Sequence, residues 1–196
     1  MDPLIVAAAV FAFAGVFGLA ILILRNKDRR QARQSPIGSA TASAGTMELR
    51  RMWLKGMPRE INIEPMGEVL GVLFDMSMSN GSASLAMTAD GSTSLYFSGG
   101  GGIIGAGGHE RVQMASSRLL RSVSERLELF EPAINHELPA RGYFRFFVMT
   151  KGELLFADAD QESTTAGTNK MSGLFRLADD VLTEVRLVDE AMQSSR

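Results

Sequence analysis

The sequence predicts an α+β fold: a two-layer domain with a five-stranded antiparallel sheet in the order β-β-β-α-β-β-α and two helices on one face, preceded by a single N-terminal transmembrane helix. Three observations predict it. An uncharged apolar run fills residues 4–24. Short apolar segments are then separated by Asn-Gly and Asp-Gly, which are strong signals of hairpin turns. Two longer segments repeat apolar residues at the three- and four-residue spacing of an amphipathic helix.

The first expected element is a membrane anchor at residues 1–25. The apolar run holds no charge, and a helix of its length spans about 31 Å, close to the thickness of a bilayer core. A cleaved signal peptide would begin with basic residues and have a shorter apolar run. We therefore expect an uncleaved span. The residues expected to meet the membrane are Leu4, Phe11, Phe17, Leu24, Arg25, Lys27, Arg29, Arg30 and Trp53.

The orientation of this anchor follows from its flanks. Lysine and arginine occur only after the run, and positive residues stay on the cytoplasmic side of a membrane. The prediction is a single-pass protein of the cell (inner) membrane with its N-terminus outside and its C-terminal domain in the cytoplasm. Small residues on the predicted helix suit close association with another copy of the chain, although an alanine-rich span explains them equally well: Ala8, Ala12, Ala14, Gly15 and Gly18.

A basic juxtamembrane segment and a flexible linker are expected at residues 26–46, where the sequence becomes small and polar. A short amphipathic helix is expected at 47–57, with Trp53 on its apolar side. Two interpretations of that helix remain open. It lies on the membrane with Trp53 at the headgroups, or it packs on the domain at 60–196. The second is favoured because ten residues bury little area alone.

The domain itself begins with three expected strands at 69–78, 83–88 and 93–98, joined by the two hairpin turns. A helix is expected at 108–130, because apolar residues recur there on one side. Strands at 143–150 and 153–159 and a helix at 172–192 complete the domain, and the first strand should pair with the fourth or fifth. The element order is similar to that of small sensor and adaptor folds such as profilin-like and roadblock-like domains.

The glycine run between the third strand and the first long helix is the main candidate for ligand binding. Gly100, Gly102 and Gly105 spell the GxGxxG pattern, and Gly107 and Gly108 follow directly before the helix. Backbone N–H groups at a helix start can hold a phosphate. The preceding strand, however, ends a meander and opens no parallel βαβ unit. The alternative is a mobile crossover from the sheet edge to the helix.

Other chemistry finds little support in the composition. The chain has no cysteine and two histidines, which excludes thiolate metal sites and thiol nucleophiles. His109 and His136 are each followed by glutamate but neither continues to HExxH. Asp158, Asp160 and Glu162 resemble a cation-binding turn only in part, and a solvated acidic turn is the better interpretation.

Asp75 and Arg145 are single charges in apolar strands, so a structural ion pair between them is expected if the strands are neighbours.

These observations favour a non-enzymatic interaction or assembly module of a membrane-associated complex, without a metal or cofactor. Residues 60–196 carry a net charge of -8, which argues against nucleic-acid binding. The expected partners are the lipid bilayer and other membrane or cytoplasmic proteins, reached through sheet edges and the glycine loop. The alternative function is a ligand-sensing domain that binds a nucleotide or other anion at residues 99–108.

Overall fold

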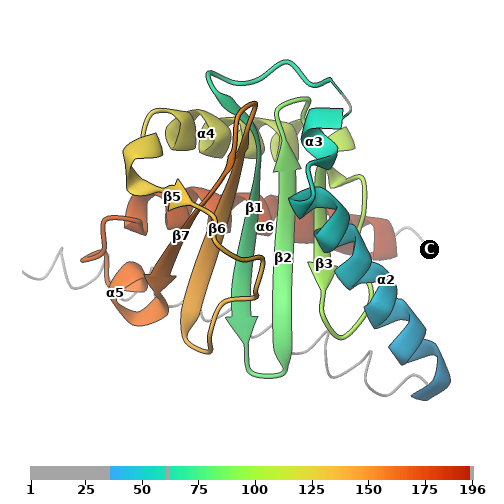
Figure 1. The fold of residues 1–196 in the computed structure, drawn as a ribbon. Coiled ribbons are helices and arrows are strands. Elements are labelled where there is room, and N and C mark those ends of the chain that lie inside the picture. The colour runs from blue at the N-terminus through green and yellow to red at the C-terminus, as the bar shows by residue number, and fades with distance from the viewer. Residues whose placement is uncertain (1–35, 61, 195–196) are drawn as a thin grey trace, which may run out of the picture.

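A seven-stranded antiparallel sheet forms the centre of the molecule, in the strand order β4-β3-β2-β1-β6-β7-β5. The computed structural model describes residues 36–60 and 62–194 (Figure 1). The strands are β1 (Val69–Met78), β2 (Gly81–Thr88), β3 (Thr93–Phe97), β4 (Gly102–Ile103), β5 (Glu131–Pro132), β6 (Tyr143–Thr150) and β7 (Leu154–Asp160).

The prediction of five strands was wrong, because the sheet has seven and the two short edge strands were missed. All five predicted strands are present, and β1 pairs with β6, the fourth predicted strand. The additional strands β4 and β5 are two residues long and lie at opposite edges of the sheet. No alternation of apolar residues marks them, because β4 lies within the glycine run and β5 contains Pro132.

The predicted transmembrane helix is also corrected. Within residues 36–60 and 62–194, no helix is both long and apolar enough to cross a membrane. The fold that the structure describes therefore contains no transmembrane helix. The apolar run at 4–24 lies outside the described residues. The membrane-facing, basic and small residues named in the sequence analysis lie outside them too, namely Leu4, Phe11, Phe17, Leu24, Arg25, Lys27, Arg29, Arg30, Ala8, Ala12, Ala14, Gly15 and Gly18.

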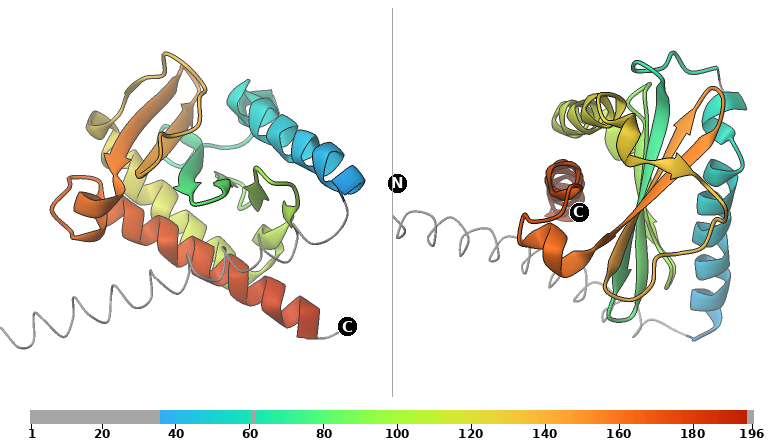
Figure 2. Two further views of the ribbon diagram at one scale, coloured as in Figure 1. Left: turned by 90° about the horizontal axis from the view of Figure 1, so that it is seen from below. Right: turned by 60° about the vertical axis from the view of Figure 1, so that its left-hand side comes forward.

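Helices cover both faces of the sheet, so the described domain has three layers where two were expected. Helices α4 (Glu110–Ser124) and α6 (Ser172–Ser194) lie side by side on one face, called here the inner face (Figure 2). Helices α2 (Pro36–Leu54) and α3 (Met57–Glu60) lie on the opposite, outer face (Figures 1 and 2). The short helix α5 (Gln161–Thr165) connects β7 to α6.

The inner face holds the main hydrophobic core. Alternate strand residues such as Phe74 and Phe146 point toward α4 and α6, as the two-residue period of a strand requires. Phe144 stacks on Phe175 of α6 with 4.5 Å between ring centroids, and Phe74 lies 4.5 Å from Phe146. This aromatic group joins the two central strands to the last helix.

The outer face holds a second, smaller core that depends on α2. Trp53 and Leu54 pack against Leu73, Phe147 and other buried residues of the central strands. Residues 36–46, where a flexible linker was expected, belong to the same continuous helix. Extending an existing helix costs far less than starting one, so docking of the last two turns favours helix in the residues before them. Gly56, with a φ of 112°, ends the helical segment.

Candidate functional site

A row of polar side chains crosses the outer face of the sheet on four adjacent strands. Ser84 on β2 lies opposite Asp75 on β1, Asp75 lies opposite Arg145 on β6, and Arg145 lies opposite Asp158 on β7. Residues in register on antiparallel neighbours point to the same face. These four side chains, three of them charged, are here called the polar row.

Helix α2 adds a fifth member, Arg50, which covers Asp75. Its Nη2 donates to Oδ2 of Asp75 at 2.6 Å, and its Nε donates to both carboxylate oxygens at 3.1 and 3.2 Å. The hydroxyl of Ser84 donates to Oδ1 at 2.5 Å. Asp75 is fully buried and Arg50 is 5% exposed. The carboxylate is therefore held entirely by protein donors.

The segment between β5 and β6, residues 133–139, lies over the same row and is here called the strap. Arg50 donates from Nη1 to the carbonyl of His136 at 2.8 Å. Arg145 donates from Nη1 to the carbonyl of Glu137 at 2.9 Å and to Oδ1 of Asn135 at 3.1 Å. Arg50 thus fastens the strap to α2, and Arg145 fastens it to the sheet.

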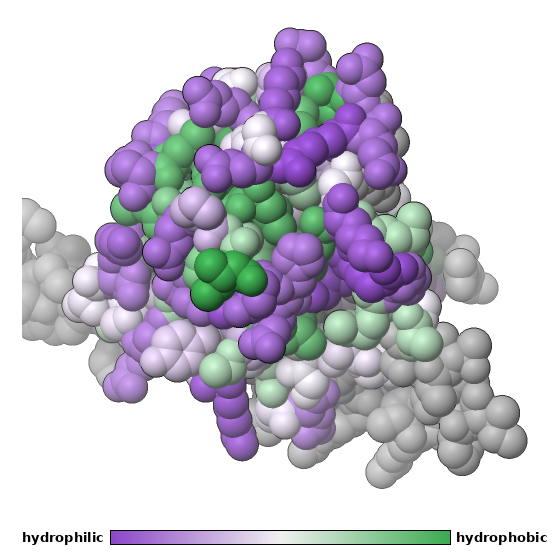
Figure 3. All heavy atoms as spheres, in the orientation of Figure 1, coloured by the Kyte–Doolittle hydropathy of each residue, from purple (hydrophilic) through white to green (hydrophobic). Residues whose placement is uncertain are grey.

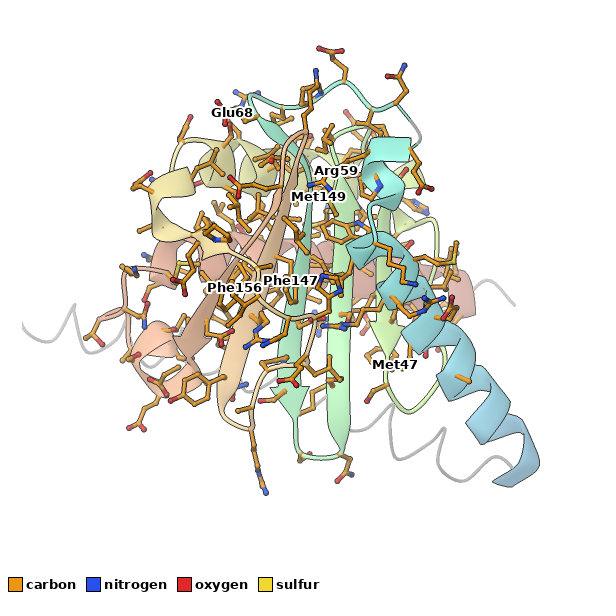
Figure 4. The ribbon with its side chains drawn as sticks, viewed as in Figure 1. Met47, Arg59, Glu68, Phe147, Met149 and Phe156 are labelled. Atoms are coloured by element: carbon orange, nitrogen blue, oxygen red, sulfur yellow. The ribbon has the colours of Figure 1, made fainter. Side chains whose placement is uncertain are left out.

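An aromatic pair lies beside these arginines. The ring centroid of Phe147 is 5.7 Å from the guanidinium carbon of Arg50 and 5.8 Å from that of Arg145, and Arg145 lies 5.4 Å from the ring of Phe156. Figure 4 shows Phe147 and Phe156 next to each other on the outer face. Contacts of this kind stabilise cations away from bulk water.

The electrostatics of the polar row indicate a structural role. Burial raises the pKa of Asp75, while hydrogen bonds and charge from Arg50, the Ser84 hydroxyl and the charge of Arg145 oppose that rise. Arg145 is paired with Asp158 at 2.6 Å, and this bond raises the pKa of Arg145 further. Arginine does not exchange its proton near neutral pH. The row has no free base or nucleophile and serves to hold α2 and the strap in place.

The expected ion pair between Asp75 and Arg145 was wrong in its partners. The two residues are register neighbours, as required, but Asp75 pairs with Arg50 and Arg145 pairs with Asp158. The sequence carried a signal for Arg50 that was missed. The buried side of α2 is Thr46, Arg50, Trp53 and Leu54, a spacing of four, three and one residues. An arginine on an otherwise buried helical stripe needs a buried acid.

Trp53 was expected to meet the membrane or to pack on the domain, and the structure places it in the outer core. It is 1% exposed, within the cluster that contains Leu73 and Phe147. Gly71 of β1 makes this possible, because a Cβ at that position would lie 3.0 Å from the indole ring. The structure thus favours the second interpretation of this helix.

The glycine loop folds back along the sheet edge. Gly100 and Gly105 have positive φ values of 97° and 77°, and Gly102 forms part of β4. A Cβ at Gly102 would lie 2.3 Å from the carbonyl oxygen of Leu95, and one at Gly107 would lie 2.1 Å from that of Gly91. Close backbone packing therefore requires glycine at Gly102 and Gly107, and the positive φ values favour it at Gly100 and Gly105.

Several backbone N–H groups of this loop already have acceptors. Gly100 donates to the carbonyl of Phe97, and Gly108 donates to the carbonyl of Gly105. The N–H of Gly105 lies 3.4 Å from the hydroxyl of Ser94. Anion binding by Gly100, Gly102, Gly105, Gly107 and Gly108 stays a prediction, and the conformation favours the alternative of a crossover.

The difference between Gly107 and Gly108 gives a direct test of this structural role. Gly107→Ala is expected to lower the free energy of unfolding by about 1–3 kcal/mol or more, because the new methyl group meets backbone that cannot move aside. Gly108→Ala is the matched control, since nothing lies within 4 Å of its Cβ position. Urea denaturation of both variants checks the prediction, and equal stabilities would contradict it.

The remaining candidate residues do not form a shared site. His109 lies before α4, on the inner face, whereas His136 lies in the strap on the outer face, with its ring 6.3 Å from that of Phe147. Asp160 caps α5 by accepting from the N–H groups of Glu162 and Ser163. Within the described ranges, no group of three or more potential metal ligands occurs.

Helices α4 and α6 form an exposed groove with apolar side chains in its lining. It is lined by the start of α4 and the last turns of α6, through His109, Glu110, Arg111, Glu184, Leu187, Val188, Ala191 and Met192. Leu187 is 41% exposed and Met192 is 45% exposed. A neighbouring hollow along α4 shares Glu110 and includes Met114, which is 58% exposed. We call the first of these the α4–α6 groove.

Asp179 of α6 makes the stability of the domain depend on pH. Burial, and then the charge of Asp180, raise the pKa of Asp179 to about 6, while the charge of Arg186 opposes the rise. Because the pKa is raised above its ordinary value of 3.8, protonated Asp179 contributes its full stabilisation of the fold below about pH 4. Its contribution is lost as the pH rises through about 6.

Asp179→Asn should therefore stabilise the domain at pH 7, by about 2 kcal/mol relative to the unmodified chain. The advantage should shrink steadily as the pH falls from 7 to 4. Asp180→Asn is the comparison: Asp180 is exposed and its charge is the smaller cause of the raised pKa of Asp179, so the substitution should stabilise the domain much less. Denaturation across this pH range checks the difference, and a constant difference would contradict the assignment.

Comparison with known proteins adds no further site. No family model, curated protein or solved structure matches the chain. The contacts and surfaces described above are therefore the basis for assigning a function.

Proposed function

We propose that the chain is a non-enzymatic interaction module, with the α4–α6 groove as its contact surface. The observation that carries this proposal is the exposure of large apolar side chains, Leu187 and Met192 in the groove and Met114 in the neighbouring hollow along α4. Clustered apolar side chains rimmed by polar ones are typical of protein contact surfaces. Charged residues stand at the rim, namely Glu110, Arg111 and Glu184.

The outer face is a weaker candidate for this role. Its central charges are already paired with one another, and α2 covers the adjoining apolar residues. Figure 3 shows this face, where hydrophobic and hydrophilic side chains are interspersed. A partner there would have to displace contacts that already exist.

The sheet edges are poorly suited to pairing with another strand. Each edge strand is only two residues long. Pro132 in β5 has no N–H to donate, and β4 lies in a loop that turns at Gly101 and Gly105. Short edges and proline are the usual means of preventing edge-to-edge association. The surface formed by α4 and α6 is therefore a better contact surface than the sheet edges that the sequence analysis favoured.

A photo-crosslinking experiment tests the proposal in cells that produce the full chain. A photoreactive amino acid replaces Leu187 in the groove, and in a second variant it replaces Lys151, an exposed turn residue between β6 and β7. We expect a discrete protein adduct from position 187 and only background from position 151. Equal background at both positions would overturn the proposal.

A further inference from the structure

We propose that Met114 and Met192 are oxidation sites, and that their reaction with a peroxide weakens partner binding at the contact surface. This inference rests on the proposed function of that surface and adds its regulation. Met192 lines the α4–α6 groove, and Met114 lies in the neighbouring hollow along α4. The chain contains no cysteine, so its only sulfur atoms that react with a peroxide are those of methionine.

Exposure separates these two side chains from the methionines of the cores. Met114 is 58% exposed and Met192 is 45% exposed. Four methionines in the two hydrophobic cores are at most 4% exposed, namely Met76, Met87, Met149 and Met171. A dissolved oxidant reaches an exposed sulfur more readily than a buried one. A low dose of peroxide therefore modifies Met114 and Met192 while the packing of the cores stays intact.

A third exposed methionine lies on the opposite side of the molecule and provides a matched control. Met52 of α2 is 46% exposed, nearly the same as Met192, but α2 covers the outer face of the sheet. Met52 should therefore oxidise about as readily as Met192. Its oxidation should leave the α4–α6 groove unchanged, because the sheet separates the two surfaces (Figure 2).

The modification is a two-electron oxidation of the thioether. The sulfur atom attacks one oxygen of hydrogen peroxide, so that an S–O bond forms as the O–O bond breaks. A proton moves to the departing oxygen, which leaves as water. The sulfur is oxidised to a sulfoxide and the peroxide is reduced. A flexible apolar side chain thus becomes a polar one at the same place on the helix.

This change acts directly on the property that suits the surface to a partner. Met192 and Leu187 supply exposed apolar area in the groove, and Met114 supplies it in the adjoining hollow. A partner that covers an oxidised methionine has to remove the sulfoxide oxygen from water, which is unfavourable unless a new hydrogen bond forms. Oxidation should therefore weaken the contact without unfolding the domain.

Peptide mass spectrometry of the purified full chain tests the order of oxidation. The chain is kept in mild detergent because of the apolar run at residues 4–24. As the dose of hydrogen peroxide rises, Met52, Met114 and Met192 should each gain one oxygen atom before any of the four core methionines does. Fluorescence of the single tryptophan, Trp53, should stay unchanged at the dose that modifies these three side chains.

Crosslinking from position 187 tests the effect on the contact. A lysate of cells that produce the chain with the photoreactive residue is treated with hydrogen peroxide, cleared with catalase and irradiated. The protein adduct should fall by about tenfold. A double variant with Met114→Leu and Met192→Leu should keep its adduct, because leucine is apolar, similar in volume and inert to peroxide. Met52→Leu is the matched control and should lose the adduct as the unmodified chain does.

The outcomes separate this inference from the proposed function. An adduct that survives oxidation of Met114 and Met192, or one that is lost equally from the double variant, would overturn the inference and leave the proposed function standing. Earlier oxidation of the core methionines, or a shift of the Trp53 emission at the same dose, would also overturn it. Absence of any adduct from the untreated chain would overturn the proposed function, and this inference with it.

Discussion

Replacing Arg50 with alanine is expected to destabilise the domain by about 3–5 kcal/mol. The substitution leaves Asp75 as a fully buried carboxylate that has lost its charged partner. It also removes the donor to the His136 carbonyl in the strap. The free energy of unfolding, measured by urea denaturation with Trp53 fluorescence as the signal, checks this value. The emission should shift to the red if α2 detaches and exposes the indole.

The neighbouring residue provides a matched control for this prediction. Arg51→Ala changes the same residue type on the same helix, but Arg51 is exposed and pairs only with exposed Glu48. Surface pairs of this kind contribute little, so the change should stay below about 1 kcal/mol. Similar effects from Arg50→Ala and Arg51→Ala would show that α2 is not fastened through the polar row.

The second large effect is expected from Trp53→Ala, which should also cost about 3–5 kcal/mol. The indole fills the space between α2 and the backbone of Gly71, and the rest of the outer core packs around it. Because the variant has no tryptophan, far-ultraviolet circular dichroism during urea denaturation is the measurement. The loss should exceed that from any exposed residue of the same helix.

Met52→Ala is the control for that experiment. Met52 is adjacent to Trp53 in the chain but is 46% exposed and faces away from the sheet. Its substitution should change stability by about 0.5 kcal/mol or less. If both variants are equally stable, α2 does not rely on the indole for its place on the sheet.

The sequence predicted the strands of the sheet well because local signals mark them. Asn80-Gly81 and Asp90-Gly91 set the two hairpins, and alternation of apolar residues sets the strands between them. The edge strands β4 and β5 could not be predicted this way. A strand of two residues is too short to show alternation. Strand β4 forms because Gly102 has no Cβ, which would collide with the backbone carbonyl of Leu95.

The site could be predicted only in part, because its members are far apart in the chain. Asp75 and Arg145 were recognised as charges that need partners, and their strands are neighbours. Their actual partners, Arg50 and Asp158, depend on where α2 packs and on the register of β7. The α4–α6 groove likewise depends on the packing of two helices about 70 residues apart, which no local pattern reveals.

Hydrogen exchange of the full chain, measured alone and with the partner captured by crosslinking from position 187, tests most directly whether the α4–α6 groove is the contact surface. The bound partner should slow exchange at residues 109–118 of α4 and 184–194 of α6, while residues 46–54 of α2 stay unchanged. Slower exchange confined to α2 or to the glycine loop at 99–108, with none in α4 or α6, would contradict the account.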